Sequence, residues 1–369
     1  MLDPISADVY VSSSLGEPSA PAGSVKVQVD GVYEAHSRRH SRGEGEPMDR
    51  GTRKRRPTGY VLVIVAIAVM TLMTLDGLPA QATTQGKNGR IVFAMDKGSG
   101  TEIYRIKRDG THLRKLTSVS GHALTPDWSP NGRRILFADD VNEGTASDLA
   151  IMHADGSHFR DLTHAGYRES PDFIPGGRHI VYGCDCGKTN GLFVSRVDGG
   201  NSRRLTKSPF RFTGDSGPAA SPDGRTVSFV RVKKGERLQA LFAVNVNGSH
   251  LRMIVPYKFE VPFKNDWAPR GNHIVFTIYG DSPGGLSPNV ATIRPDGTHM
   301  RILTHVDRAG VGAAAGSYSP NGRWIAFKIF NSNTGTNRLW KMRADGSERT
   351  RIASLPASPR GIDWGQQPG

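Results

Sequence analysis

The stretch GDSPG at residues 280–284 has the form of the G-x-S-x-G motif that carries the nucleophile of many hydrolases. In those enzymes the serine stands on a strained turn between a strand and the helix that follows it. Here Pro283 and two glycines lead into LSPNVATIRPDG, which has the pattern of another strand and hairpin. The sequence therefore predicts that Ser282 is not a nucleophile, and we assign no catalytic residue.

Four histidines recur at one position, three residues after an Asp or Asn: His112, His158, His250 and His299. Equivalent positions in different repeats lie far apart unless they line a common axis. Zinc needs all its ligands about 2 Å from one ion. We therefore expect surface or packing histidines and no metal ligands. No cofactor is expected, and a divalent cation in the channel described below has no support from the ligand pattern.

The chain has only two cysteines, Cys184 and Cys186, separated by one residue. A bridge over so short a loop would be strained, and two thiolates do not complete a tetrahedral zinc site. We expect two cysteines at a strand end or in a loop, with a redox or metal role as the alternative.

Carboxylates and aromatic residues also recur. We expect the acids of the Asp-Gly pairs to serve the turns in which they lie: Asp109, Asp155, Asp198, Asp296 and Asp345. We expect the aromatic residues to pack between strands: Trp128, Trp267, Trp364, Phe173 and Tyr318. A stacking platform for a sugar or a base is the alternative for the aromatic set.

These residues belong to a repeat that must position them. The Asp or Asn before Gly in phrases such as RDGTHLRKLT falls at positions 109, 155, 198, 247, 296 and 345, which gives six units spaced by 43 to 49 residues. A second phrase, TPDWSPNGRRILFADD at 125–140, recurs with the same period. Each unit therefore has two hairpin signals. Asp-Gly and Asn-Gly favour two-residue primed turns, so the sequence predicts four antiparallel strands in each unit.

The second strand of each unit indicates how the units pack. Segments such as RIVFAM, RILFAD and HIVFTI are apolar on both faces of the pleat, so both faces must be covered. Four-stranded sheets stacked around an axis provide that cover. The sequence thus predicts an all-β, six-bladed β-propeller of four-stranded antiparallel blades. The first repeat element begins at Asn88 and the last is GIDWGQQPG, so we expect Asp363 and Trp364 to pair beside Ile91 and Phe93 and close the ring.

The units PDWSPNGRRILF and TEIYRIKRDGTHLRKLT resemble the repeat of TolB-type six-bladed propellers, which also occurs in the propellers of prolyl-oligopeptidase-like enzymes. The resemblance covers about residues 87–365 and implies the propeller fold. The resemblance to TolB-type proteins implies a separate α/β domain before the propeller. The segment between Ala82 and Asn88 is too short to hold one. A role in the Tol-Pal envelope system is therefore not simply implied.

The front of the chain has the pattern of an export signal. From Met48, a basic group of residues 53–56 precedes an apolar run over 60–75, and Ala80 and Ala82 form an A-x-A cleavage site. We expect 1–47 to be disordered or untranslated leader, 48–82 a signal peptide, and 83–369 the propeller. An uncleaved anchor with its apolar run at 60–75 is the alternative, since a span needs about 20 residues. Either reading puts the protein in the periplasm or outside the cell.

The formal charge of +14 comes from the repeat region, because residues 1–82 hold equal numbers of acids and bases. The basic residues are scattered along the sequence, so we expect no nucleic-acid partner. We also expect a monomer whose only membrane contact would be an uncleaved segment 60–75.

Function must lie in the segments that break the repeat, which are the connections from each fourth strand to the next inner strand. Loops on a rigid scaffold concentrate binding residues. The candidates for a binding rim are Arg168, Glu169, Arg211, Asp215, Lys264, Asn265 and Arg360. We expect an exported, non-catalytic module that binds a protein or a cell-envelope polymer. The alternatives are an extracellular carbohydrate-active lyase or hydrolase that uses acids such as Glu169 and Asp215, and a detached propeller that regulates a separate catalytic protein.

Overall fold

The computed structural model describes residues 86–98, 100–140, 146–164, 166–186, 189–208, 214–233, 238–262, 264–279 and 287–368. Within these ranges every regular element is a β-strand except a single 3-10 turn at Tyr257–Phe259. The all-β fold class is therefore confirmed. The predicted leader, the signal segment and Ser282 lie outside the described residues.

The strands pair into six antiparallel units of four strands, and single parallel pairs, Thr101 with His122 and Ser147 with Tyr167, join the first three units into one 12-stranded sheet. The first three, each given from its innermost strand outward, are β24 (Arg360–Gln366), β1 (Asn88–Asp96), β2 (Thr101–Lys107) and β3 (Arg114–Lys115); β4 (His122–Trp128), β5 (Arg134–Asp140), β6 (Ser147–His153) and β7 (Arg160–Asp161); and β8 (Tyr167–Phe173), β9 (His179–Cys186), β10 (Thr189–Arg196) and β11 (Arg203–Arg204).

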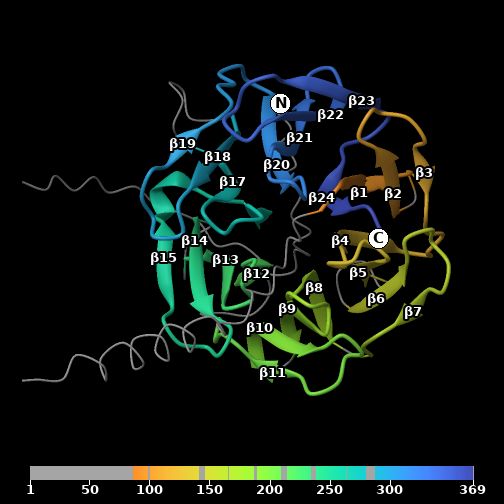
Figure 1. The fold of residues 1–369 in the computed structure, drawn as a ribbon, viewed down its shortest axis with the longest axis vertical. Coiled ribbons are helices and arrows are strands. Elements are labelled where there is room, and N and C mark those ends of the chain that lie inside the picture. Colours follow the sequence, from red (N-terminus) through yellow and green to blue (C-terminus); the bar gives the residue numbers. More distant parts are fainter. Residues whose placement is uncertain are drawn as a thin grey trace, which may run out of the picture. The chain divides into compact units, whose positions relative to one another are not determined.

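The other three are β12 (Asp215–Ala220), β13 (Thr226–Val232), β14 (Gln239–Asn245) and β15 (Arg252–Val255); β16 (Asn265–Trp267), β17 (Ile274–Ile278), β18 (Asn289–Ile293) and β19 (Arg301–Ile302); and β20 (Val311–Tyr318), β21 (Trp324–Asn331), β22 (Thr336–Arg343) and β23 (Thr350–Leu355). Figure 1 shows these units following one another around a central axis, with β4, β8, β12, β20 and β24 toward the axis and β3, β7, β11, β15, β19 and β23 at the periphery. The described strands thus form the blades of a propeller.

The ring closes through strands from opposite ends of the sequence. Strand β24 pairs antiparallel with β1, and the register places Trp364 opposite Ile91 and Asp363 opposite Val92. This confirms the predicted closure. Closure joins the two ends of the repeat and leaves the short outermost strands as the sheet edges.

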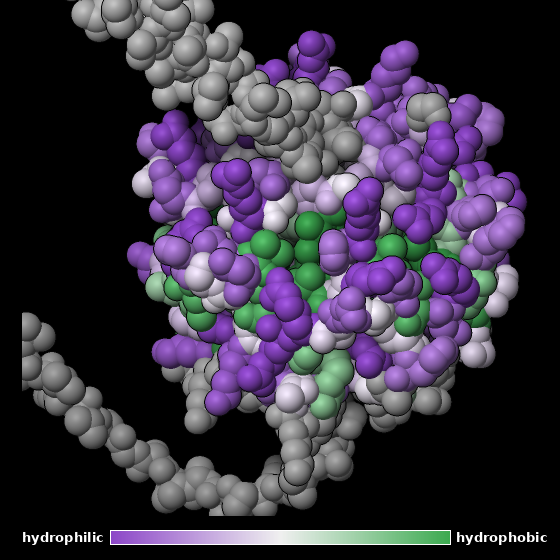
Figure 2. All heavy atoms as spheres, turned by 60° about the horizontal axis from the view of Figure 1, so that its bottom comes forward, coloured by the Kyte–Doolittle hydropathy of each residue, from purple (hydrophilic) through white to green (hydrophobic). Residues whose placement is uncertain are grey.

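The second strands are buried on both faces, as the sequence predicts. Five phenylalanines at one repeat position are fully buried: Phe93, Phe137, Phe229, Phe276 and Phe327. Burying such a side chain contributes about 1.5–3 kcal/mol relative to leaving it in water. The three repeated tryptophans Trp128, Trp267 and Trp364 are buried as well, as expected for packing residues. Figure 2 shows hydrophobic residues in a band between hydrophilic side chains on one side of the molecule.

The outer hairpins form, but their turn type differs from the predicted primed turn. Gly110 has a φ of 87°, whereas Asp109 has no positive φ. The Lys107 amide donates to the Thr111 carbonyl at 2.9 Å, which leaves three residues in the loop. Three-residue loops combine a type I turn with one left-handed residue, so one glycine suffices. The repeated histidines follow these turns with left-handed φ and are exposed: His112, His158, His250 and His299.

The inner hairpins differ in the same way. Gly132 has a φ of 66° while Asn131 is not left-handed. The Ser129 amide donates to the Arg134 carbonyl at 2.9 Å, so the loop has four residues built on a type I turn. The hairpins are confirmed, and the prediction of two-residue primed turns is wrong.

Cys184 and Cys186 are joined by a disulfide, with their Cα atoms 5.5 Å apart. The expectation of two unbridged cysteines is therefore wrong. Both lie on the extended strand β9, where the alternation of side chains points residues i and i+2 to the same face.

Among the described residues no helix is long and apolar enough to cross a membrane.

Candidate functional site

Four aspartates converge on the axis at the innermost strands: Asp127, Asp172, Asp266 and Asp363. Each is the acid of a PDW-like phrase, and each precedes the buried aromatic residue of its strand. The four line one cavity together with Trp128, Phe173 and Trp364. We call these four side chains the axial carboxylates. Sequence reasoning missed them, although their recurrence before a packing aromatic residue was a usable signal.

The axial carboxylates link each blade to the next. In every case Oδ2 accepts a hydrogen bond from a backbone amide of the following inner strand. The pairs are Asp363 with Trp128 at 2.9 Å, Asp127 with Phe173 at 2.9 Å, Asp172 with Ala220 at 2.8 Å and Asp266 with Tyr318 at 2.7 Å. These bonds satisfy amides that the sheet ladders leave unpaired, so the acids have a structural role.

The other two blades use different groups at the same position. Ser317 Oγ accepts the Trp364 amide at 2.7 Å, in place of a carboxylate. Ala219 has no polar side chain, and there Trp267 Nε1 donates to the Ala219 carbonyl at 3.0 Å. Asn265 Nδ2 donates to the Gly217 carbonyl at 2.7 Å between the same two strands. The ring is therefore asymmetric, with all its axial charge on four of six blades.

Burial changes the acidity of this cluster. It raises the pKa of Asp172 to about 6 and raises the pKa values of Asp127 and Asp266 well above their ordinary value, with neighbouring carboxylates adding to the effect on Asp127. Asp127, Asp172 and Asp266 therefore hold their protons to higher pH than exposed aspartates do.

Lys264 supplies the positive charge for the axial carboxylates. It stands two residues before Asp266, at the approach to β16. Burial lowers the pKa of Lys264, but the charges of the four carboxylates, Asp363 first, outweigh burial and raise it. Lys264, which we expected at a rim, is therefore partly buried and feels the charges of the axial carboxylates.

The axial cavity has a volume of about 40 Å³. One water needs roughly 10–15 Å³ measured in this way, so the space holds a few waters. It is too small for a sugar ring or a side chain of a partner. Among the described residues, no group of three or more His, Cys, Asp or Glu side chains is arranged to hold a metal ion. The axial carboxylates therefore have a structural role in the scaffold.

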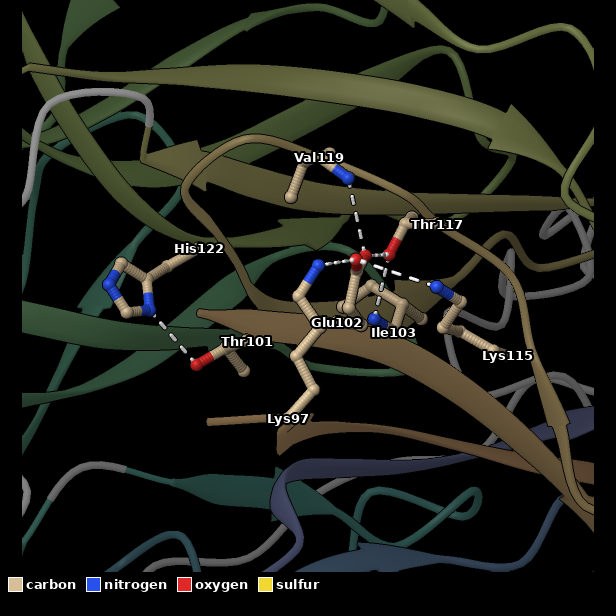
Figure 3. Close-up of polar contacts among 8 residues, drawn as sticks. All are labelled: Lys97, Thr101, Glu102, Ile103, Lys115, Thr117, Val119 and His122. Atoms are coloured by element: carbon tan, nitrogen blue, oxygen red, sulfur yellow. Dashed lines mark hydrogen bonds and ion pairs between the residues drawn. The ribbon is translucent and has the colours of Figure 1, made fainter. Parts of the chain in front are cut away.

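The loop face is the end of the propeller where each blade connects to the next inner strand. On the first blade it carries a buried carboxylate, Glu102, at the start of β2 (Figure 3). Lys97 Nζ lies 2.6 Å and Lys115 Nζ 3.8 Å from Glu102 Oε1. The Thr117 hydroxyl donates to Oε2, and the Val119 amide lies 3.4 Å from the same oxygen. These contacts fix the loop that leaves β3.

Beside it, a polar chain joins the closing strand to the second blade. The buried Thr101 hydroxyl donates to Asp96 Oδ1 at 2.8 Å and lies 3.0 Å from His122 Nδ1. Arg360, one of the expected rim residues, donates from Nη2 to Asp96 Oδ2 at 3.1 Å. Arg360 is therefore partly buried in a contact between β24 and β1.

Two further rim candidates are neighbours on β8. Arg168 Nη1 lies 3.5 Å from Asp148 Oδ1, which ties the third blade to the second. Burial raises the pKa of Glu169 to about 7, the range in which a carboxyl can take and release a proton at neutral pH. Its side chain packs against Gly183, as does the backbone carbonyl of Asp215.

The remaining residues expected at the rim are Asp215, Asn265 and Arg211. Asp215 is buried, and Arg231 binds it with two hydrogen bonds of 2.6 and 2.7 Å while the Thr206 hydroxyl donates to it at 2.6 Å. Asn265 is buried between strands, as described above. Arg211 lies outside the described residues. The structure therefore uses Asp215 and Asn265 in scaffold contacts, and it leaves Arg168 and Glu169 as consecutive residues of β8, whose side chains point to opposite faces of the strand.

Comparisons with known proteins agree with this architecture. Residues 52–213 match the family described as the TolB beta propeller domain. The chain is 26% identical over 363 residues to a protein named TolB homolog from Chlorobium luteolum, covering 98% of this chain and 76% of that protein. It is 36% identical over 241 residues to the Tol-Pal system protein TolB of Anaeromyxobacter dehalogenans, covering 62% of this chain and half of that protein.

The solved structures show the same fold. The crystal structure of TolB from Acinetobacter baumannii matches with a TM-score of 0.60 and 18% identity, over 82% of this chain and 71% of that one. The repeat, the strand order and these similarities lead to one conclusion: the chain is a β-propeller protein similar to TolB proteins.

Proposed function

We propose that this protein is an exported, non-catalytic binding module whose loop face and channel mouth bind a protein or another component of the cell envelope. The observation that carries the proposal is that the polar groups at the axis make scaffold contacts, whereas the loops differ from one blade to the next. The axial carboxylates bond from blade to blade and line a cavity of about 40 Å³. The six unlike loops around the mouth then offer the variable surface that recognition needs.

Exposed charges on those loops supply the polar part of such a surface. Lys207 follows β11 and Arg308 precedes β20, both on connections between blades. Isolated surface charges of this kind steer a partner and tune the association rate more than they add affinity. The named relatives belong to the TolB group, one of them to the Tol-Pal system, which supports a periplasmic location and an envelope partner for this chain.

A carbohydrate-active enzyme is the weaker alternative. Its best support is the pKa of Glu169, which burial raises to about 7. Acid–base cleavage of a glycosidic bond uses two carboxyl groups that flank the bond. The nearest expected second acid, Asp215, is committed to Arg231 and Thr206. A binding module requires no such rearrangement and is better supported.

Site-specific crosslinking tests the binding proposal. A photoreactive residue is placed at Lys207 or Arg308 on the loop face, and at Arg178 or Arg225 on the opposite face as matched controls, since all four side chains are exposed. The full chain is expressed in its own cell envelope and irradiated. We expect a discrete adduct from at least one loop-face position that the controls do not form.

The charge-reversed variants Lys207→Glu and Arg308→Glu should weaken the same adduct when the photoreactive residue occupies the other loop-face site. Adducts from the control positions alone, or none from any position, would overturn the proposal.

A further inference from the structure

The disulfide between Cys184 and Cys186 joins two residues that the sheet already holds in place. Strand β9 is paired on both sides here, because Cys184 lies opposite Gly191 of β10 and opposite Arg168 of β8. Cys186 lies opposite Thr189 of β10. A disulfide stabilises a protein mainly by closing a loop of the unfolded chain, and the effect grows with the length of that loop. Only one residue separates these cysteines, so the bond adds little to what the sheet ladders fix.

The two cysteines differ in their access to solvent. Cys184 is 6% exposed and packs with Leu149 and Tyr182 in the core between the second and third blades. Cys186 is only partly buried, at the end of β9. Gly166 lies beside it, and a β-carbon built on that glycine would be 3.6 Å from Cys186 Sγ. A thiolate that attacks this disulfide from solvent therefore reaches the Cys186 sulfur, and the Cys184 sulfur is the one that leaves.

A guanidinium lies beside the sulfur that would leave. Arg168 and Cys184 are direct cross-strand partners, so their side chains extend from the same face of the sheet with β-carbons about 5 Å apart. Arg168 Nη1 also lies 3.6 Å from the β-carbon position at Gly166, the point that Cys186 Sγ approaches equally closely. A nearby cation stabilises a thiolate and lowers the pKa of the thiol.

Two acids flank this group. Asp148 Oδ1 lies 3.5 Å from Arg168 Nη1 and orients the guanidinium. Asp185 stands between the cysteines but extends to the opposite face of β9, because side chains alternate along a strand. On β8 and β9, the charged side chain that shares the face of the two sulfurs at this level is therefore Arg168.

We propose that the Cys184–Cys186 disulfide is a thiol–disulfide exchange site that oxidises a dithiol of a protein or peptide. One thiolate of the dithiol attacks Cys186 Sγ and forms a mixed disulfide, and the bond to Cys184 breaks with its electron pair on Cys184 Sγ, beside Arg168. The second thiolate of the dithiol then attacks the sulfur of the first and releases Cys186. The dithiol loses two electrons and two protons, and the two cysteines gain both as thiols. A disulfide such as oxidised glutathione reverses the step and restores the bridge.

Reduction of the full-length wild type with dithiothreitol tests the bridge without any substitution. After an acid quench, the thiols are alkylated in denaturant and counted by mass spectrometry, and the urea unfolding midpoint is measured for the oxidised and the reduced protein. We expect both thiols to form while the protein stays folded, with little change in the midpoint. A bridge that is reduced only at urea concentrations that unfold the protein would be a structural crosslink and would overturn the proposal.

Single-cysteine variants test which sulfur is attacked. Cys184→Ser leaves the thiol of Cys186, and Cys186→Ser leaves the thiol of Cys184. With oxidised glutathione in excess, the thiol of Cys186 should form the mixed disulfide about tenfold or more faster than that of Cys184. Equal rates, or a faster reaction at Cys184, would contradict the order of attack.

The role of Arg168 is tested in the Cys186→Ser protein. Adding Arg168→Gln should raise the pKa of the Cys184 thiol, which is read from the pH profile of its reaction rate. Lys207→Gln is the matched control, because it removes an exposed cation from another connection and should leave this pKa unchanged. An unchanged pKa with Arg168→Gln would remove Arg168 from the site.

Turnover is measured with a synthetic peptide that contains two thiols, and with oxidised glutathione as the disulfide that restores the bridge. The wild type should form the peptide disulfide about tenfold or more faster than Cys184→Ser/Cys186→Ser, which should give the uncatalysed rate. Equal rates with the two proteins would overturn the activity. Photocrosslinking at Lys207 and Arg308 involves no thiol, so the binding proposal and this one fail independently.

Discussion

The carboxylate of Asp363 accepts the backbone amide of Trp128 at 2.9 Å, across 235 positions of the sequence. The bond joins the last inner strand, β24, to the inner strand of the next blade, and β24 also pairs with β1. The ends of the repeat are therefore held both by a sheet ladder and by a side chain at the axis. Predictions about stability follow from this ring of bonds and from its charges.

Removing the bond at Asp363 should loosen the closure. Asp363→Ala leaves the buried Trp128 amide without its acceptor, which costs about 1–3 kcal/mol of unfolding free energy. Asp363→Asn keeps a side-chain oxygen and should cost less. Urea unfolding and hydrogen exchange at the Trp128 amide measure the effect. Equal stability of the alanine variant and the wild type would contradict it.

Titration of Asp172 should make stability depend on pH in the direction opposite to ordinary acid denaturation. Burial raises its folded pKa to about 6 from 3.8, so the folded state holds the proton more tightly. The contribution is fully present below about pH 4 and is lost as the pH rises through about 6. Relative to Asp172→Asn, the wild type should lose about 1–3 kcal/mol between about pH 4 and about pH 7.

Urea unfolding at several pH values checks this difference. Ser317→Ala is a matched control, because it removes the acceptor of the Trp364 amide without removing a charge. The loss of stability in Ser317→Ala should not vary with pH. If the stability difference between Asp172→Asn and the wild type were also constant with pH, the raised pKa of Asp172 would be refuted.

Lys264 should be needed wherever the axial carboxylates are ionised. Lys264→Met removes the ammonium that their charges stabilise. Loss of one partner from a buried ionic cluster typically costs about 3–5 kcal/mol, and the loss should be larger at about pH 8 than at about pH 5. Calorimetry at the two pH values measures it. Lys264→Met/Asp266→Asn should recover part of the stability, and Lys207→Met at an exposed lysine should change little.

The pair formed by Asp215 and Arg231 should be a scaffold contact. Arg231→Met leaves a buried carboxylate unpaired, at a cost of about 3–5 kcal/mol. Arg231→Lys keeps the charge but loses the two parallel hydrogen bonds, so its stability should lie between those of the wild type and Arg231→Met. Adding Asp215→Asn to Arg231→Met should restore part of the loss. If Asp215→Asn instead abolished partner crosslinking while stability was unchanged, Asp215 would be a binding residue.

The fold could be predicted because each repeat contains local signals for its strands and turns. The two-sided apolar strands, of which Phe93 and Phe137 are members, required cover on both faces, and stacked blades supply it. The partial first and last units required Asp363 and Trp364 to lie beside β1. The turn type was missed, since Asp-Gly fits more than one turn and only the backbone path selects between them.

The candidate site could be predicted far less well. Loop position correctly suggested exposure for some connections, but it could not show that Asp215 meets Arg231 or that Arg360 meets Asp96. Lys264 was expected at the rim, and the sequence could not show that the charges of four axial carboxylates raise its pKa. Pairing between residues far apart in sequence depends on the rotation from blade to blade, which no single repeat encodes.

The sequence by itself determined the architecture of this protein: the number of repeats, the four strands in each, the buried strands and the closure between β24 and β1. The period of the repeat and the apolar pattern of its strands are local properties that recur in every unit. The tertiary structure alone decided that Asp127, Asp172, Asp266 and Asp363 share one axial cavity. The physical reason is that circular closure brings equivalent positions of distant units to a common axis or a common surface, and charge and burial at those places are properties of the assembled ring.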